Sequence, residues 1–90
     1  MSVQIEIPSF LMDFTRGMTT ATVNGNTVGE CMTDFFRQFP QAKEFLTERN
    51  GELKGYIGIF LNGKSTYPKE LNRSVKDGDT IYIFNVIEGG

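Results

Sequence analysis

The sequence predicts an α+β domain in which one main helix packs on one face of a mixed sheet of four to five strands. Three segments lead to this prediction. Residues 3–7 alternate apolar and polar side chains, which is typical of a strand with one buried face. Residues 28–39 repeat apolar side chains at helical spacing. Residues 80–87 are rich in β-branched and aromatic side chains and follow a turn signal, which indicates a final strand.

A long connection separates the first strand from the second. Pro8 ends the first strand, and Phe10, Leu11 and Phe14 follow it in the connection. We expect these three apolar side chains to cover one end of the core. The Thr-rich segment 19–23 predicts a second strand, which would pair with the first as a hairpin with a long loop.

The helix has clear start and stop signals. Thr27 and Glu30 have the spacing of a capping box, in which two side chains satisfy backbone N–H groups of the first turn. Pro40 predicts the end of this helix. Residues 41–47 predict a short second helical turn that would place Phe45 against the edge of the core. The apolar stripe of the main helix consists of Val28, Cys31, Met32, Phe35, Phe36 and Phe39.

The third strand, predicted at 56–61, and the last strand each present different side chains on their two faces. Asn62 and Gly63 suit a type I′ hairpin turn after the third strand, and a short irregular strand is expected around 64–67. The aliphatic faces should meet the helix stripe and complete one core. The inward residues are Ile57, Ile59, Leu61, Ile81 and Ile83, and the outward ones are Tyr56, Phe60, Tyr82 and Phe84.

Composition excludes several classes of function. A chain of 90 residues with a net charge of −2 indicates one domain without the basic stripe of a nucleic-acid-binding protein. One cysteine, and the lack of a signal-peptide pattern or long apolar run, predict a cytoplasmic protein without a membrane partner. The absence of histidine removes Ser-His, Cys-His and His-ligated metal chemistry. We therefore expect no catalytic residue, no metal site and no bound cofactor.

Gly89 and Gly90 are the candidate functional residues. We expect a folded domain over 1–87 and a tail over 88–90. Glycine has no Cβ, so the backbone of the tail can approach another surface closely, and Gly90 would carry a free α-carboxylate. A strand that projects a slim peptide with a carboxylate tip suits insertion into the active site of another protein. The alternative is an ordinary frayed terminus.

The order of these motifs resembles the β-grasp, or ubiquitin-like, fold, and more closely the sulfur carrier proteins. Within that family, the spacing is most similar to the small subunit of molybdopterin synthase. The resemblance covers almost the whole chain, although Asn85 and Glu88 replace a proline and a small residue that are common there. The motifs are Val3-Ile5-Ile7-Pro8, Leu11 with Phe14-Thr15, Thr27-Val28-Gly29-Glu30, the segment from Ile57 to Gly63, the segment from Val75 to Asp79, and Gly89-Gly90.

The resemblance implies a carrier or co-substrate rather than an enzyme. An E1-like adenylating enzyme would use ATP to activate the carboxylate of Gly90, and sulfur from a persulfide donor would then leave a thiocarboxylate there. The favoured recipient is a sulfur-accepting synthase such as the large subunit of molybdopterin synthase, in molybdenum cofactor biosynthesis. Carriers for cysteine, methionine, thiamin, siderophore or tRNA thiolation are alternatives. A ubiquitin-like modifier joined to lysines and a plain binding module with an inert tail also remain open.

Phe60, Tyr82 and Phe84 form a candidate partner-docking patch, because exposed neighbouring aromatic side chains are typical of protein interfaces. The alternative is that loops, or Met12 and Met18, cover them as a second small cluster. Cys31, on the helix stripe, is expected to be a small core residue rather than a thiol nucleophile.

Overall fold

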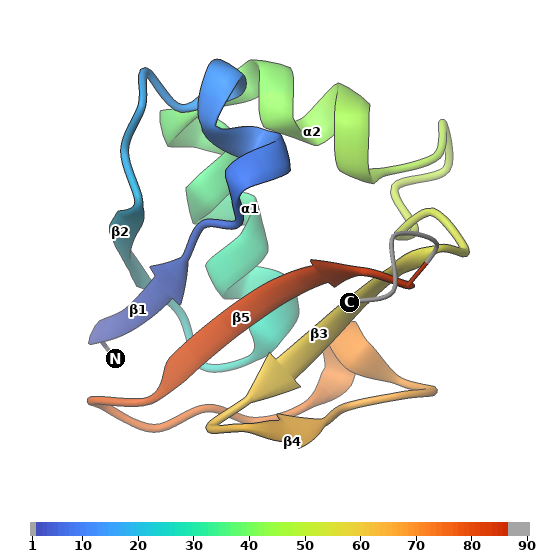
Figure 1. Cartoon of the computed structure of the whole chain (residues 1–90). Helices are drawn as coiled ribbons and strands as arrows, with labels where there is room; N and C mark the ends of the chain where they lie inside the picture. The colour runs from blue at the N-terminus through green and yellow to red at the C-terminus, as the bar shows by residue number, and fades with distance from the viewer. Residues whose placement is uncertain (1, 87–90) are drawn as a thin grey trace.

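A computed structural model describes residues 2–86 as a five-stranded sheet with the helices gathered on one side of it (Figure 1). The predicted α+β architecture is confirmed. The strands are β1 (Ser2–Glu6), β2 (Thr20–Asn24), β3 (Ile57–Leu61), β4 (Lys64–Ser65) and β5 (Thr80–Asn85). The α-helices are α1 (Val28–Gln38) and α2 (Pro40–Leu46), and two 3-10 turns are η1 (Ser9–Phe14) and η2 (Glu70–Asn72). The predicted tail 88–90 and the last residue of the predicted domain, 87, lie outside the described residues.

The sheet is mixed, with the order β2-β1-β5-β3-β4. β1 pairs antiparallel with β2 and parallel with β5, so that Ile5 lies between Ala21 and Ile81. β3 pairs antiparallel with both β5 and β4. The first and last strands are therefore neighbours in the middle of the sheet. Because β5 and β3 are antiparallel, the end of β5 lies next to the start of β3 (Figure 1).

The core forms where the aliphatic faces of the strands meet α1. Ile5, Ile81 and Ile83 on the sheet and Phe35 on α1 are completely buried. The 3-10 turn η1 closes one end of this core, with Leu11 fully buried. The tilted rings of Phe10 and Phe14 on η1 pack against Phe45 of α2 there, at the end of the core that the sequence predicted for them. Tyr56, expected on the opposite face, instead lies just before β3 and packs against the core.

The start of α1 follows the capping pattern with one difference. The Oγ1 atom of Thr27 accepts a hydrogen bond from the Glu30 N–H at 3.1 Å, as predicted. The Glu30 carboxylate accepts from the N–H of Asn26 at 2.7 Å rather than from that of Thr27. Pro40 both ends the first helix and begins the second, because proline is tolerated at the first helical position.

Asp34 is the one buried charged side chain among residues 2–86, and the helix pattern did not reveal it. Its carboxylate pairs with the guanidinium of Arg37 and accepts a hydrogen bond from the N–H of Asn24 at 2.9 Å. These contacts join α1 to the end of β2. The hydrogen bond from Arg37 is the main cause that lowers the pKa of Asp34 below the ordinary value of an aspartate.

Candidate functional site

Phe60, Tyr82 and Phe84 lie together on the face of the sheet opposite the helices. Phe60 on β3 is the direct neighbour of Tyr82 on β5 in the antiparallel register. The ring of Phe60 stacks on that of Phe84 at 4.4 Å between centroids and on that of Tyr82 at 6.3 Å. The structure therefore brings the three predicted residues into one cluster, which we call the aromatic patch. Its role in docking remains a prediction.

The aromatic patch is partly open to solvent. Tyr82 is 40% exposed, and the other two rings are half-buried. Met12 packs against the core cluster, and Met18 is itself 48% exposed. Neither methionine seals the patch into a second closed core, so a partner can reach these rings.

Gly58 explains how Phe84 is held. A Cβ at position 58 would come within 2.2 Å of the Cζ atom of Phe84. The ring therefore lies directly across β3 at the one position that has no side chain. A glycine inside a strand is typical of such a close approach, and here it orients the ring that stacks on Phe60.

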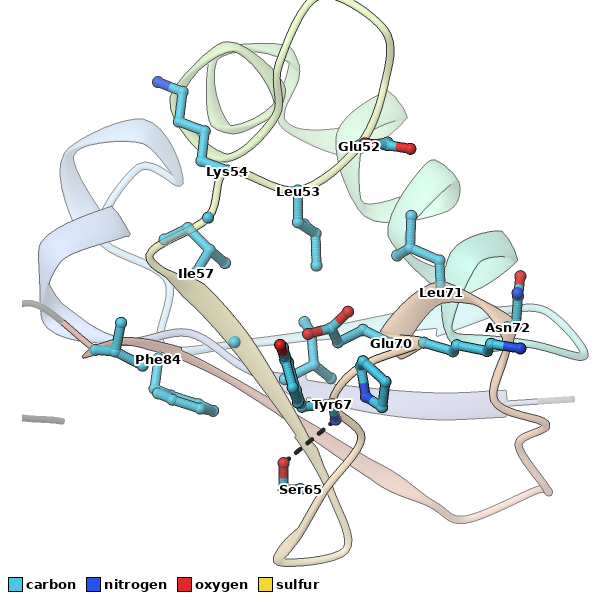
Figure 2. A pocket seen from close by; sticks show the side chains of 16 residues that line it. Glu52, Leu53, Lys54, Ile57, Ser65, Tyr67, Glu70, Leu71, Asn72 and Phe84 are labelled. Carbon is cyan, nitrogen blue, oxygen red and sulfur yellow. Dashed lines mark hydrogen bonds between the residues drawn. The ribbon is translucent and has the colours of Figure 1, made fainter.

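A groove runs beside the first half of β3, and local sequence patterns did not reveal it. The short strand β4 pairs only with Phe60 and Leu61, so in the described part of the chain the start of β3 has no strand neighbour on this side. Figure 2 shows Phe84 on one side of β3 and Leu53 and Leu71 on the other, all lining the groove. The groove and the aromatic patch therefore share Phe84.

The end of β5 is anchored at the rim of the groove. The N–H of Val86 donates to the carbonyl of Tyr56 at 2.9 Å, so the pairing with the start of the β3 segment continues to residue 86. Val86 also lines the groove and is 52% exposed. Gly89 and Gly90, the predicted attachment residues, lie outside the described residues. The backbone that leads to them is held in a defined direction up to Val86.

Cys31 lies in the core, as expected. Its side chain is completely buried, and burial raises the pKa of the thiol, which opposes formation of a reactive thiolate. Within residues 2–86 no group of three or more Cys, Asp or Glu side chains could hold a metal ion. Over the same range no helix has the length and apolar character needed to cross a membrane.

Comparison with known proteins connects this geometry to sulfur transfer. No protein-family model matches the sequence. The chain is 26% identical over 93 aligned residues to the sulfur carrier protein CysO of Mycobacterium tuberculosis, and the alignment covers all of both chains. Its homologues are sulfur carrier proteins of the ubiquitin-like β-grasp fold.

Two solved structures support the same fold. A chain in the crystal structure of the Amycolatopsis orientalis BexX/CysO complex is 28% identical and superposes with a TM-score of 0.84, over 92% of this chain and 93% of that one. SAMP1 of Haloferax volcanii superposes with a TM-score of 0.86 over the full length of both chains at 22% identity. The predicted β-grasp fold is therefore confirmed.

The comparisons also bear on function. The relatives are carriers rather than catalysts, which confirms the expectation of a carrier. The names of these relatives do not mention molybdopterin, so the recipient of the sulfur remains a prediction.

Proposed function

We propose that this chain is a sulfur carrier that is activated at the carboxylate of Gly90. The observation that carries the proposal is the full-length similarity to a sulfur carrier protein, together with the same fold. The anchored end of β5 supports it, because Val86 starts the tail from a fixed position beside an open surface. Two terminal residues without side chains suit a tail that enters a narrow active site.

The chemistry needs an activating enzyme and ATP. A carboxylate oxygen of Gly90 attacks the α-phosphorus of ATP, which releases pyrophosphate and leaves an acyl-adenylate. A persulfide sulfur on a donor protein then attacks the carbonyl carbon and displaces AMP. A thiolate finally cleaves the S–S bond of this adduct, which leaves the thiocarboxylate on Gly90 and a disulfide on the donor side. No side chain of this chain takes part in these bond changes.

For the recipient, we favour a molybdopterin precursor held by the large subunit of a molybdopterin synthase, because the motif spacing resembles that of the small subunit. The carrier role does not depend on this choice. Cysteine or methionine synthesis, thiamin synthesis, siderophore thioacids and tRNA thiolation use the same thiocarboxylate. A protein modifier would use the same activated carboxylate, and the fold shared with a protein named small archaeal modifier protein 1 makes it the second candidate.

The proposal is tested by intact mass spectrometry after incubation with the cognate adenylating enzyme, ATP and a sulfur donor. We expect a mass gain equal to the replacement of one oxygen by one sulfur, and no gain in a chain that lacks Gly90. An unchanged mass together with no ATP–pyrophosphate exchange would reject the carrier role.

The recipient and the modifier alternative need separate measurements. The thiocarboxylate form, incubated with each candidate synthase and its acceptor, should return to the carboxylate mass only with the true recipient. Discharge with a different synthase alone would reject the molybdopterin assignment. Lysine-linked conjugates on a denaturing gel, dependent on ATP and Gly90, would instead identify a modifier.

A further inference from the structure

A second pocket, which we call the helix-side pocket, lies on the side of the sheet that carries the helices. It has a volume of about 390 Å³ and is lined by both α-helices, by the turn at Gly51 and by Leu71 of η2. The helices and the aromatic patch are on opposite sides of the sheet (Figure 1). A partner bound in the helix-side pocket therefore leaves the aromatic patch accessible.

Gly29 holds one wall of the helix-side pocket against α1. A Cβ at position 29 would lie 2.9 Å from the carbonyl oxygen of Leu71, which is too close for a side chain. Glycine allows this approach because it has no Cβ. The N–H of Val28 also donates to the carbonyl of Arg73 at 2.8 Å, which ties the same segment to the start of α1. Leu71 is thereby fixed where it lines both this pocket and the groove beside β3 (Figure 2).

The apolar side chains of the pocket are only partly covered by the rest of the chain. Met32 is buried, whereas Phe36, Leu53 and Leu71 are half-buried. Phe36 follows the completely buried Phe35 on α1, so its ring lies at the border of the apolar stripe rather than in the core. An apolar side chain of a partner would remove the remaining surface of these residues from water, which favours binding.

The charged side chains that line the pocket are both basic. They are Arg37 on α1 and Lys43 on α2, and among residues 2–86 no Asp or Glu joins them in the lining. Arg37 pairs with Asp34, but its side chain is 78% exposed, so further N–H groups of the guanidinium remain accessible. That ion pair is the one found over the same range, so Lys43 has no acidic partner there. The pocket is therefore a local basic site on a chain of net charge −2.

We propose that the helix-side pocket binds a short acidic segment of a partner protein, which buries one apolar side chain against Phe36 and Leu71 and places carboxylates on Arg37 and Lys43. Carboxylates fit because both cations are exposed and a guanidinium binds carboxylates in a bidentate manner. A peptide segment fits because the pocket is open to solvent, whereas a small-molecule site encloses most of its ligand. No step of the chemistry at Gly90 needs this site, so the inference goes beyond the carrier function.

NMR of the backbone N–H groups of the full chain tests the site with a defined probe, the peptide acetyl-Asp-Leu-Phe-Asp-Glu-amide. We expect saturable shifts of the signals of Gly29, Thr33 and Lys43, with a Kd of about 1 mM. The analogue with Asn and Gln in place of the acidic residues should bind about fivefold more weakly. Added salt should weaken binding of the acidic peptide more than binding of the neutral one.

Two charge-reversal variants separate the pocket from the overall charge of the chain. Lys43→Glu should raise the Kd of the acidic peptide about tenfold, because attraction becomes repulsion. Lys64→Glu is the matched control, because it makes the same change on an exposed residue of β4 outside the pocket and should leave the Kd unchanged. Phe36→Ser should weaken the acidic and the neutral peptide by the same factor, because it removes apolar contact from both.

Three results would overturn the proposal. They are equal affinity for the acidic and the neutral peptide, equal Kd values for Lys43→Glu and Lys64→Glu, and no shift of the pocket signals at about ten times the expected Kd. Shifts of the same signals with protein concentration alone, together with a doubled mass in sedimentation, would assign the pocket to a second copy of this chain. That outcome would also reject the acidic segment as its occupant.

Discussion

The side chains on the two faces of the central strands differ in how deeply they are buried and in whether their charges have partners. On the inner face, Ile5 and Ile81 are fully buried, and the nearby charge of Asp34 has two hydrogen-bonding partners. On the outer face, Tyr82 is 40% exposed and Glu6 has no ion-pair partner within residues 2–86. The side chains of the inner face thus find their packing and hydrogen-bond partners within this chain. The outer face leaves aromatic side chains open to solvent, as the predicted docking role of the aromatic patch requires.

Phe35→Ala should have the largest effect on stability, because it removes a completely buried ring that contacts Phe39 at 5.3 Å between centroids. Loss of such a side chain and the cavity left behind should lower the free energy of unfolding by about 3–5 kcal/mol. Urea denaturation followed by circular dichroism measures the change. Glu44→Ala, exposed on α2, should stay within about 0.5 kcal/mol. Equal losses in the two variants would contradict the assignment of the inner face as the stabilising one.

Gly58→Ala should have an intermediate effect and connect the two faces. The new Cβ would collide with the ring of Phe84 and push it off Phe60. Overpacking of this kind should cost about 1–2 kcal/mol of unfolding free energy, measured by denaturation. Gly55→Ala is the control, because a Cβ there meets no atom within 4 Å. If the two variants are equally stable, Phe84 is not held by Gly58.

Asp34→Asn should lower stability by about 1 kcal/mol at neutral pH, because a charged hydrogen-bond acceptor becomes neutral. The hydrogen bond from Arg37 lowers the pKa of Asp34 in the folded protein. The stabilisation is therefore complete above the ordinary aspartate pKa of about 3.9 and is lost as the pH falls through that value toward the lower folded pKa. The stability difference between wild type and variant should shrink below about pH 4. A constant difference down to pH 2 would show that the carboxylate charge is not the cause.

Tyr82→Ser should have the smallest effect on stability and a clear effect on activation. Its ring is partly exposed and stacks only loosely on Phe60, so the loss should be about 0.5 kcal/mol. The KM for the carrier in ATP–pyrophosphate exchange should nevertheless rise. A variant that unfolds as readily as Phe35→Ala would assign Tyr82 to the core rather than to a docking surface.

Much of the fold could be predicted because its signals are local. Alternation in β1 and β5, the cap at Thr27 and the turn at Asn62 each depend on neighbouring residues. Asn62 and Gly63 both have positive φ, 53° and 82°, as the type I′ turn requires. The aromatic patch was also predictable, because alternation places Tyr82 and Phe84 on the same face of one strand.

Other features could not be predicted from local patterns. The partners of Asp34 come from two different elements, and the groove exists because β4 is too short to cover the start of β3. Glu6 and Tyr82 are 76 positions apart in the sequence, and they become neighbours only because β1 and β5 pair in parallel. No local periodicity contains that pairing.

The amino-acid sequence by itself determined the elements, the aliphatic core and the diglycine on which the proposed chemistry depends. Backbone propensity, side-chain alternation and caps act over a few residues, so they can be read along the chain. Tertiary structure decided which residues became neighbours: Gly58 beneath Phe84, Val86 beside Tyr56, and Glu6 next to Tyr82. These contacts join distant segments, and only the packing of the whole sheet against its helices determines their register.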